Sequence, residues 1–430
     1  MTLVDAIAYA KAHQPQVRAA LAHIAAQTAE ADVPRAQWLP VIGVTAQIFG
    51  ATANNTTGTY ASPRGVDIPR IGGTRSVSSG TWQPYATTLV AGGARQELFD
   101  FGRIAAQSAA ADARVDIERQ HARSVALDVT FDVEEAYFAV LAGKAVVKAS
   151  EDAYDRARVH RDLAKAGVDA GLRSPIELTR AEADLARFDI GRVRARGGLA
   201  VAQTTFAAGV GVDDAALDAG PAPAAPPDLP ALDAAIRQGA ARDPRLLEVL
   251  AELHAEEQRT RAVGAELRPD LTLTGTLSGR AGGAPPSGNG EPANHDGWLP
   301  NVPNWDVGVV FSWSLFDGTV TARKDASRAR EQVRREELTL ARHDEAAAVR
   351  VAYGSVEVAR TALPSLQRSV EAARANYAQA EARFRSGLGT SVELADAEAL
   401  RTDAEIQLAL GQFQLARARA VFGRSVAEGL

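Results

Sequence analysis

The residue types that usually carry chemistry form no complete catalytic or metal-binding pattern in this chain. Asp100, Phe101 and Gly102 match the DFG triplet of protein kinases, but neither a glycine-rich loop nor an HRD motif accompanies them. The seven histidines show no HExxH motif and no paired spacing that suits a metal ion. We therefore predict that the protein is not an enzyme and needs neither a cofactor nor a metal.

Other common chemical signals are equally incomplete. Gly387, Leu388 and Gly389 lack the preceding strand and the third glycine of a dinucleotide site, so a turn between helices explains them better. The chain has no cysteine, which excludes disulfides, thiolate ligands, a cysteine nucleophile and a lipid anchor on cysteine. Its net charge of -6 is mild and contains no block of like charge, which argues against a nucleic-acid partner.

The sequence contains two copies of one long repeat. Residues 3–49 align with residues 232–278 without a gap at an offset of 229, and the LFD triplet at Leu98 recurs at Leu315. Only two copies exist, which excludes a solenoid of short repeats. We expect a first repeat over 1–208, a Pro/Ala-rich linker over 209–230 and a second repeat over 231–430.

Each repeat ends in a pair of very long predicted helices. Residues 102–168 contain no proline, and a second helix is expected from Pro175 to Ala208, so the first helical hairpin covers about 102–208. Its counterpart covers about 319–424. A helix of more than sixty residues spans about 100 Å, and we expect it to pack beside equally long partners.

Each repeat also contains a predicted strand hairpin, over about 41–99 and about 270–315. Apolar and polar residues alternate there, as in LTLTGTLS from Leu271. One interpretation is a small soluble sheet with an apolar face on a core. The other is an outer-membrane sheet, because each hairpin joins strands of about ten residues through a long polar loop.

The tryptophans favour the membrane interpretation. All five lie in or beside the strand regions, and none lies in the long helices. Aromatic residues at strand ends suit a membrane interface. The predicted interface aromatics are Trp82, Trp298, Trp305 and Trp313, with Trp38 beside the first strand. Four strands cannot close a barrel, so membrane insertion would require several chains.

The chain shows no window near 18 consecutive apolar residues, so we predict no membrane-spanning helix. It opens with TLVDAIAYA, without a basic segment followed by an apolar one. Either the protein is cytosolic or a signal peptide has been removed.

Taken in order, these motifs resemble the TolC-type outer-membrane factor family over essentially the whole chain. They are LVDAIAYAKAHQP, the Leu39-Pro40 pair, LFDFGR and LFDG after the hairpins, and GLRSPIEL and GLGTSVEL at the helical turns. The resemblance implies a mostly α protein with membrane β-structure. Its tandem-duplicated protomer of very long helices and four strands would form a homotrimer, with a 12-strand β-barrel continued by a 12-helix α-barrel.

The function that the resemblance implies is that of an exit duct in the outer membrane, extending into the periplasm. Its partners would be outer-membrane lipid, a periplasmic adaptor (membrane fusion protein) and an inner-membrane pump of the RND, ABC or MFS type, as in tripartite efflux or type I secretion. The alternative is a periplasmic coiled-coil adaptor or scaffold. An adaptor should carry a lipoyl-like β-domain around one helical hairpin, whereas this chain has two.

The resemblance also assigns roles at the two helical turns. An adaptor-docking tip is matched by Gly171, Ser174, Gly387, Gly389, Thr390 and Ser391. A periplasmic gate is matched by Glu393 and Asp396, whose carboxylates would form rings in a trimer. The equivalent positions in the first repeat are Glu177 and Arg180, which can pair at i, i+3 on their helix. A solvated helix face is the alternative for these charges, and an ordinary tight turn for the glycines.

Overall fold

A computed structural model of the chain describes residues 1–52, 61–62, 65–66, 84–213, 217–223, 228–282 and 302–428. These residues form two compact units, and each unit contains segments from both sequence repeats. The first consists of Met1–Ala26, Asp116–Ala251 and Arg335–Leu430, and the second of Gln27–Val115 and Glu252–Arg334. Both strand hairpins belong to the second unit, and both helical turns belong to the first.

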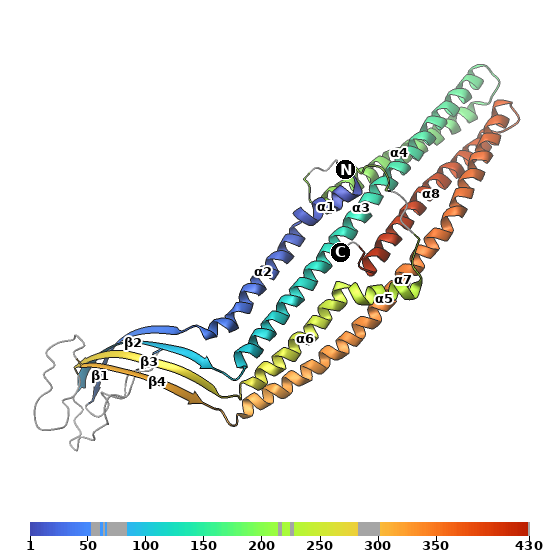
Figure 1. Cartoon of the computed structure of the whole chain (residues 1–430). Helices are drawn as coiled ribbons and strands as arrows, with labels where there is room; N and C mark the ends of the chain where they lie inside the picture. Colours follow the sequence, from blue (N-terminus) through green and yellow to red (C-terminus); the bar gives the residue numbers. More distant parts are fainter. Residues whose placement is uncertain are drawn as a thin grey trace, which may run out of the picture. The chain divides into compact units, whose positions relative to one another are not determined.

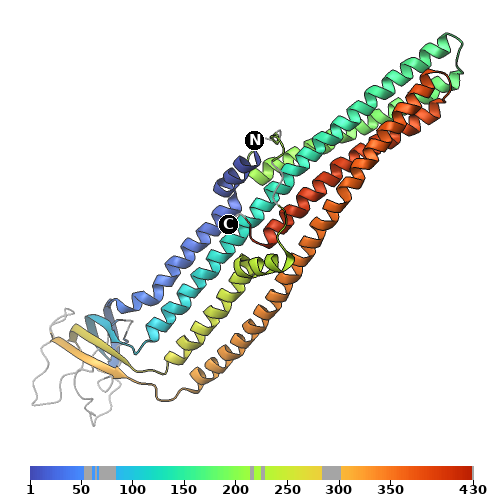
Figure 2. The ribbon, with the colours of Figure 1, turned by 45° about the vertical axis from the view of Figure 1, so that its right-hand side comes forward.

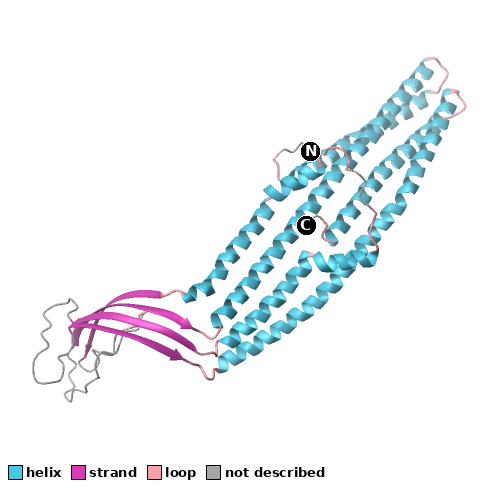
Figure 3. Ribbon diagram, viewed as in Figure 1, coloured by secondary structure: helices cyan, strands magenta, loops and turns pink. Residues whose placement is uncertain are grey.

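Apart from the short helix η1, the elements follow the same order in both repeats (Figures 1 and 3). The first repeat contains α1 (Leu3–His13), α2 (Pro15–Arg35), η1 (Ala36–Trp38), β1 (Val41–Thr52), β2 (Pro84–Phe99), α3 (Arg103–Asp169) and α4 (Pro175–Val210). The second contains α5 (Leu232–Arg242), α6 (Pro244–Ala265), β3 (Asp270–Gly282), β4 (Val302–Ser312), α7 (Gly318–Arg385) and α8 (Ser391–Ser425).

The two longest helices confirm the prediction of one very long helix in each repeat. Helix α3 has 67 residues and α7 has 68, which corresponds to about 100 Å each. Pro364 lies inside α7 without ending it. None of the helices in the described part of the chain has the length and apolar content that a membrane-spanning helix needs.

The aspartate of each LFD triplet caps the long helix that follows it. Asp100 accepts hydrogen bonds from the backbone N–H groups of Gly102, at 2.9 Å, and of Ile104. Asp317 accepts from Thr319 at 2.8 Å and from Val320 at 3.3 Å. These side chains satisfy N–H groups that lack a partner within the helix. The kinase-like triplet is therefore a helix start.

Within the first unit, each repeat builds its own apolar core at equivalent positions. In the first repeat the core includes Ala6, Val133, Tyr137, Val140, Phe206 and Val210. In the second it includes Ala235, Val349, Val356, Phe422 and Val426, with Tyr353 packed against it. The Tyr137 and Phe206 rings lie 5.6 Å apart edge to face, and those of Tyr353 and Phe422 lie 6.0 Å apart. The short helices α1 and α5 thus pack on their own hairpins through duplicated contacts.

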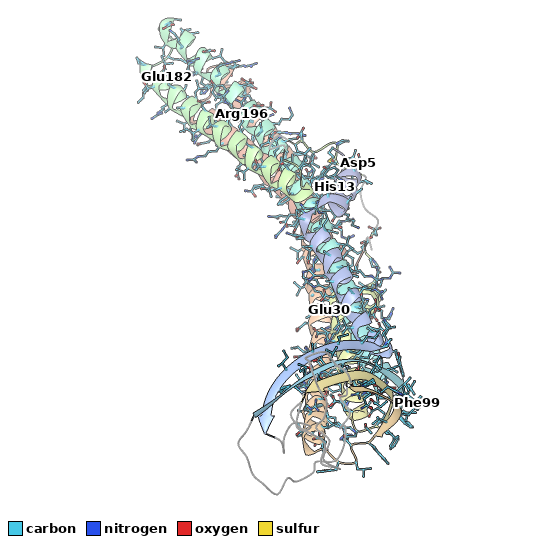
Figure 4. All side chains as sticks on the ribbon, turned by 90° about the vertical axis from the view of Figure 1, so that its left-hand side faces the viewer. Asp5, His13, Glu30, Phe99, Glu182 and Arg196 are labelled. Carbon is cyan, nitrogen blue, oxygen red and sulfur yellow. The ribbon has the colours of Figure 1, made fainter. Side chains whose placement is uncertain are left out.

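The long helices of the first unit form two antiparallel hairpins, α3 with α4 and α7 with α8 (Figures 1 and 2). Charged side chains cross between the helices of each hairpin. Arg196 on α4, labelled in Figure 4, bonds Glu151 on α3 at 2.6 Å. Arg374 on α7 bonds Glu405 on α8 at 2.8 Å.

In the second unit, four antiparallel strands form one sheet in the order β1-β2-β3-β4. Strand β2 pairs with β3, for example Gly92 with Leu277, so the two hairpins join into a single sheet. Strands β1 and β4 form its edges. Strand β4 ends at Ser312, before Leu315, and the indole of Trp313 donates a hydrogen bond of 3.1 Å to the Leu267 carbonyl.

Candidate functional site

One face of the sheet is mainly apolar and exposed, and the opposite face, which carries Thr and Ser side chains together with Leu89 and Ala91, is buried. Val44 on β1 and Trp305 on β4 lie in one cross-strand row and are 78% and 74% exposed. On the opposite face, Thr272 is 1% exposed and Ser278 is 4% exposed. A soluble sheet has the reverse arrangement, with its apolar face on a core. The sheet therefore has the pattern of a lipid-facing surface.

The described tryptophans lie at or near the ends of this sheet. Trp38 ends η1 before β1, Trp305 lies in β4, and Trp313 follows β4. All three are exposed, as the interface prediction requires. The predicted interface residues Trp82 and Trp298 lie outside the described residues.

The two helical turns have the same backbone structure. Leu172 N–H donates to the Gly167 carbonyl at 2.8 Å, and Leu388 N–H donates to the Arg383 carbonyl at 2.9 Å. Gly171 and Gly387 have φ angles of 72° and 75°. This left-handed conformation is strained for any residue that has a side chain. The glycines thus end α3 and α7, which accounts for their recurrence.

The turns carry exposed apolar side chains that the sequence analysis did not single out. Leu172 is 83% exposed and Leu388 is 76% exposed. Their recurrence after the turn glycines was the available signal. Of the predicted tip residues, Ser174 and Thr390 are exposed, whereas Ser391 is buried.

The expected pairing of Glu177 with Arg180 is wrong. The Glu177 carboxylate pairs instead with Arg173, at 2.7 Å. The same guanidinium donates to the Phe384 carbonyl at 2.9 Å and lies 3.8 Å from the Phe384 ring centroid. These contacts on α7 fix Arg173 above the first turn of α4, where it reaches Glu177, and leave Arg180 exposed.

The two predicted carboxylates of the second repeat differ in their surroundings. Glu393 forms a capping box with Thr390, in which the Thr390 hydroxyl accepts from Glu393 N–H at 3.2 Å. Asp396 is exposed and makes no hydrogen bond or ion pair within the described residues. Its first-repeat counterpart, Arg180, is likewise exposed and without such a partner there. The divergence between the copies therefore lies mainly at this one exposed position.

A largely buried ion pair between the two hairpins was missed by the sequence analysis. Arg156 on α3 binds Glu398 on α8 through two bonds of 2.8 and 2.7 Å, and these side chains are 19% and 5% exposed. Thr402 donates to the same carboxylate at 3.0 Å. Local spacing could not reveal a pair separated by 242 positions.

A histidine packs beside this ion pair. His160 on α3 is buried, and its ring lies edge to face on Phe384 at 4.8 Å. Burial lowers the pKa of His160, with Arg173 acting in the same direction and Asp184 and Glu177 opposing it. The neutral ring therefore packs between the hairpins. No group of three potential ligand side chains in the described ranges is placed to hold a metal ion.

The duplicated helical hairpins and the sheet with its exposed apolar face define a class of protein, the outer-membrane duct protomer. A sequence model of the family "Outer membrane efflux protein" matches residues 6–212 and again residues 235–422. The chain belongs to this family, and the match to both repeats agrees with the duplication. Family membership assigns the protein to the outer membrane and to efflux.

Individual relatives resemble the chain over most of its length. Protein CyaE of Bordetella pertussis is 28% identical over 405 residues, covering 93% of this chain and 78% of that protein. The CmeC outer membrane channel of Campylobacter jejuni is 14% identical, with a TM-score of 0.77, covering 100% of this chain and 86% of that one. The open-state MtrE outer membrane channel of Neisseria gonorrhoeae is 18% identical, with a TM-score of 0.72, covering 100% and 89%. The two solved structures share the fold.

Proposed function

We propose that three copies of this chain form an exit duct that passes substrates from a periplasmic adaptor and an inner-membrane pump across the outer membrane. The observation that carries the proposal is the sheet with its exposed apolar face and its two edge strands, which pair on one side only within the described residues. Strand β4 of one copy would pair with β1 of the next, and three copies would close twelve strands. The long hairpins would then line a twelve-helix tunnel.

The family match favours this duct over a periplasmic adaptor or scaffold. It covers both helical hairpins and both strand hairpins, whereas an adaptor would need only one helical hairpin. The absence of enzymatic activity stays a prediction that follows from the role of a passive duct.

The duct proposal is tested by fractionation and by electrical recording. The full chain should fractionate with the outer membrane, migrate as a trimer in mild detergent and conduct ions across planar bilayers. Recovery as a buffer-soluble monomer without conductance would refute the duct and favour the scaffold.

The adaptor-docking tip is proposed to consist of the two turns and their exposed leucines. Leu172 and Leu388 present apolar side chains beside Gly171 and Gly387, which suits burial by a partner helix. Ser391 is left out because it is buried. Leu172→Ser and Leu388→Ser together should abolish adaptor binding without changing trimer migration. Unchanged adaptor affinity would remove the turns from the interface.

The periplasmic gate is proposed to combine a carboxylate ring with a link between the hairpins. Asp396 supplies the ring, because its side chain is exposed and makes no hydrogen bond or ion pair within the described residues. Glu393 would contribute a second ring although it also caps α8. Arg173 supplies the link, because it joins the first turn to the end of α7. Rings of acidic side chains attract cations into a pore.

Single-channel recording separates the ring from the link. Asp396→Asn should weaken block by a trivalent cation, and Glu393→Gln should do so while keeping a capping side chain. Glu182→Gln, an exposed acid on α4 labelled in Figure 4, serves as the matched control. Unchanged cation block in both variants would refute the ring assignment.

The link is tested by Arg173→Ala, which should raise the open fraction of the channel. Arg385→Ala is its control, because Arg385 lies in the last turn of α7 and pairs within that helix, with Glu381 at 2.6 Å. Equal open fractions in the wild type and both variants would remove Arg173 from the gate.

A further inference from the structure

A cleft of about 670 Å³ lies within the first compact unit, between the linker and four helices. We call it the linker pocket. Its walls come from α1 and α3 of the first repeat, from residues 223 and 228–230 of the linker, and from α5, α8 and the residues after α8. Its volume lies in the range of sites that hold small organic molecules.

The walls of the linker pocket are mainly apolar. They include Leu3 and Ile7 on α1, Leu127, Phe131 and Phe138 on α3, and Leu415 on α8. Aliphatic and aromatic walls favour a ligand with a compact apolar body, because such a body would remove these surfaces from water.

Glu134 is the acidic wall residue that is partly buried, whereas Asp228 and Glu428 are exposed. Glu134 on α3 makes no hydrogen bond or ion pair within the described residues. Burial raises the pKa of Glu134, the Glu428 carboxylate adds to the increase, and Lys11 opposes it. A partly buried carboxylate that lacks a donor is costly, and a cation or N–H donor bound beside it would offset that cost.

The charges around the pocket also favour a cationic ligand. Among the basic side chains of the wall, Arg424 is paired with Asp128. Lys11 and Arg419 also have interactions of their own. The acidic Asp228 and Glu428 have no side-chain partner within the described residues. Among the wall residues, the three carboxylates of Glu134, Asp228 and Glu428 therefore outnumber the one basic atom, the buried Nε of Arg419, that lacks a partner within the described residues.

We propose that the linker pocket binds a small organic amine, with its protonated nitrogen at the Glu134 carboxylate and its apolar body against Leu3, Phe131 and Leu415. The occupant would contact both repeats and the linker at once. This site is separate from the turns and from the sheet, and the proposal does not rest on channel activity.

The test uses the full chain in amphipol and isothermal titration calorimetry with three ligands that share one apolar body. These are 1-adamantanemethylamine, the neutral 1-adamantanemethanol and the anionic 1-adamantaneacetate. The amine should bind saturably, once per chain, and about tenfold more tightly than the alcohol, because a hydrogen bond to a charged group is worth about that much. The acetate should bind more weakly than the alcohol.

Two variants locate the site. Glu134→Gln should lower the amine affinity about tenfold and leave the alcohol affinity unchanged. Leu3→Trp should fill the pocket and weaken both ligands, which keeps the test decisive if the first variant folds poorly. Equal affinities for the three ligands, or amine binding that neither variant changes, would overturn the proposal.

Discussion

Glu345 is a buried carboxyl group at a position where the first repeat has a valine. It lies on α7, is 7% exposed, and corresponds to Val129 at the repeat offset of 216. It packs against Gly239 on α5, where a Cβ atom would lie 2.0 Å from the Glu345 Oε1 atom. That oxygen has no hydrogen-bond partner within the described residues. We therefore predict that Glu345 destabilises the folded chain at neutral pH.

The size and sign of the effect follow from its pKa. Burial, with a smaller contribution from the Asp243 charge, raises the pKa of Glu345 from 4.5 to about 6. The folded chain thus holds this proton more tightly than the unfolded chain. The stability that this tighter proton binding gives the folded chain is fully present below pH 4.5 and is lost as the pH rises through about 6. A difference of about 1.5 pKa units corresponds to about 2 kcal/mol.

Glu345→Gln removes the titration and keeps the shape of the side chain. Guanidinium unfolding of the full chain, followed by helical circular dichroism, should be compared with wild type between about pH 4 and about pH 7.5. Over this range, wild type should lose about 2 kcal/mol relative to the variant. The control is Glu371→Gln, an exposed acid on the same helix. A stability difference that does not change with pH would refute the reasoning.

Three further predictions concern stability, and each is checked by unfolding of the full chain. Arg156→Ala should lower the free energy of unfolding by about 3 kcal/mol, because it leaves Glu398 buried without its partner. The double variant Arg156→Met with Glu398→Leu should recover most of that loss, and equal losses in the two variants would refute a charge effect. Asp317→Ala should cost about 1 kcal/mol through the lost cap, and Asp317→Asn should cost less; equal costs would contradict the capping role. Gly387→Ala should destabilise the chain by about 1 kcal/mol, because Gly387 has a positive φ. Gly354→Ala in the interior of α7 should not destabilise the chain, and the reverse order would contradict the turn assignment.

The elements of this fold were predictable because their signals are local. The proline-free stretch before Asp169 and the alternation after Asp270 depend only on neighbouring residues, and both elements form as predicted. The pairing of β2 with β3 is a contact between the repeats, and nothing in either hairpin alone specifies it.

The site residues were less predictable because their partners come from distant parts of the chain. Glu177 was expected to pair with a neighbour on its own helix, but the position of Arg173 is set by contacts with Phe384 on α7. The pairing of Arg156 with Glu398 likewise depends on how α3 and α8 pack. Periodicity along one helix carries no information about such contacts.

The two edges of the sheet have a consequence for the order of assembly. One edge is β1 from the first repeat and the other is β4 from the second, so copies that pair through these strands, as proposed above, join head to tail. Two joined copies still expose one β1 and one β4, as many free edges as a single chain. Only the last copy added to a ring forms two seams at once and leaves no edge. Ring closure should therefore be strongly cooperative, and partial rings should be the species most prone to aggregate.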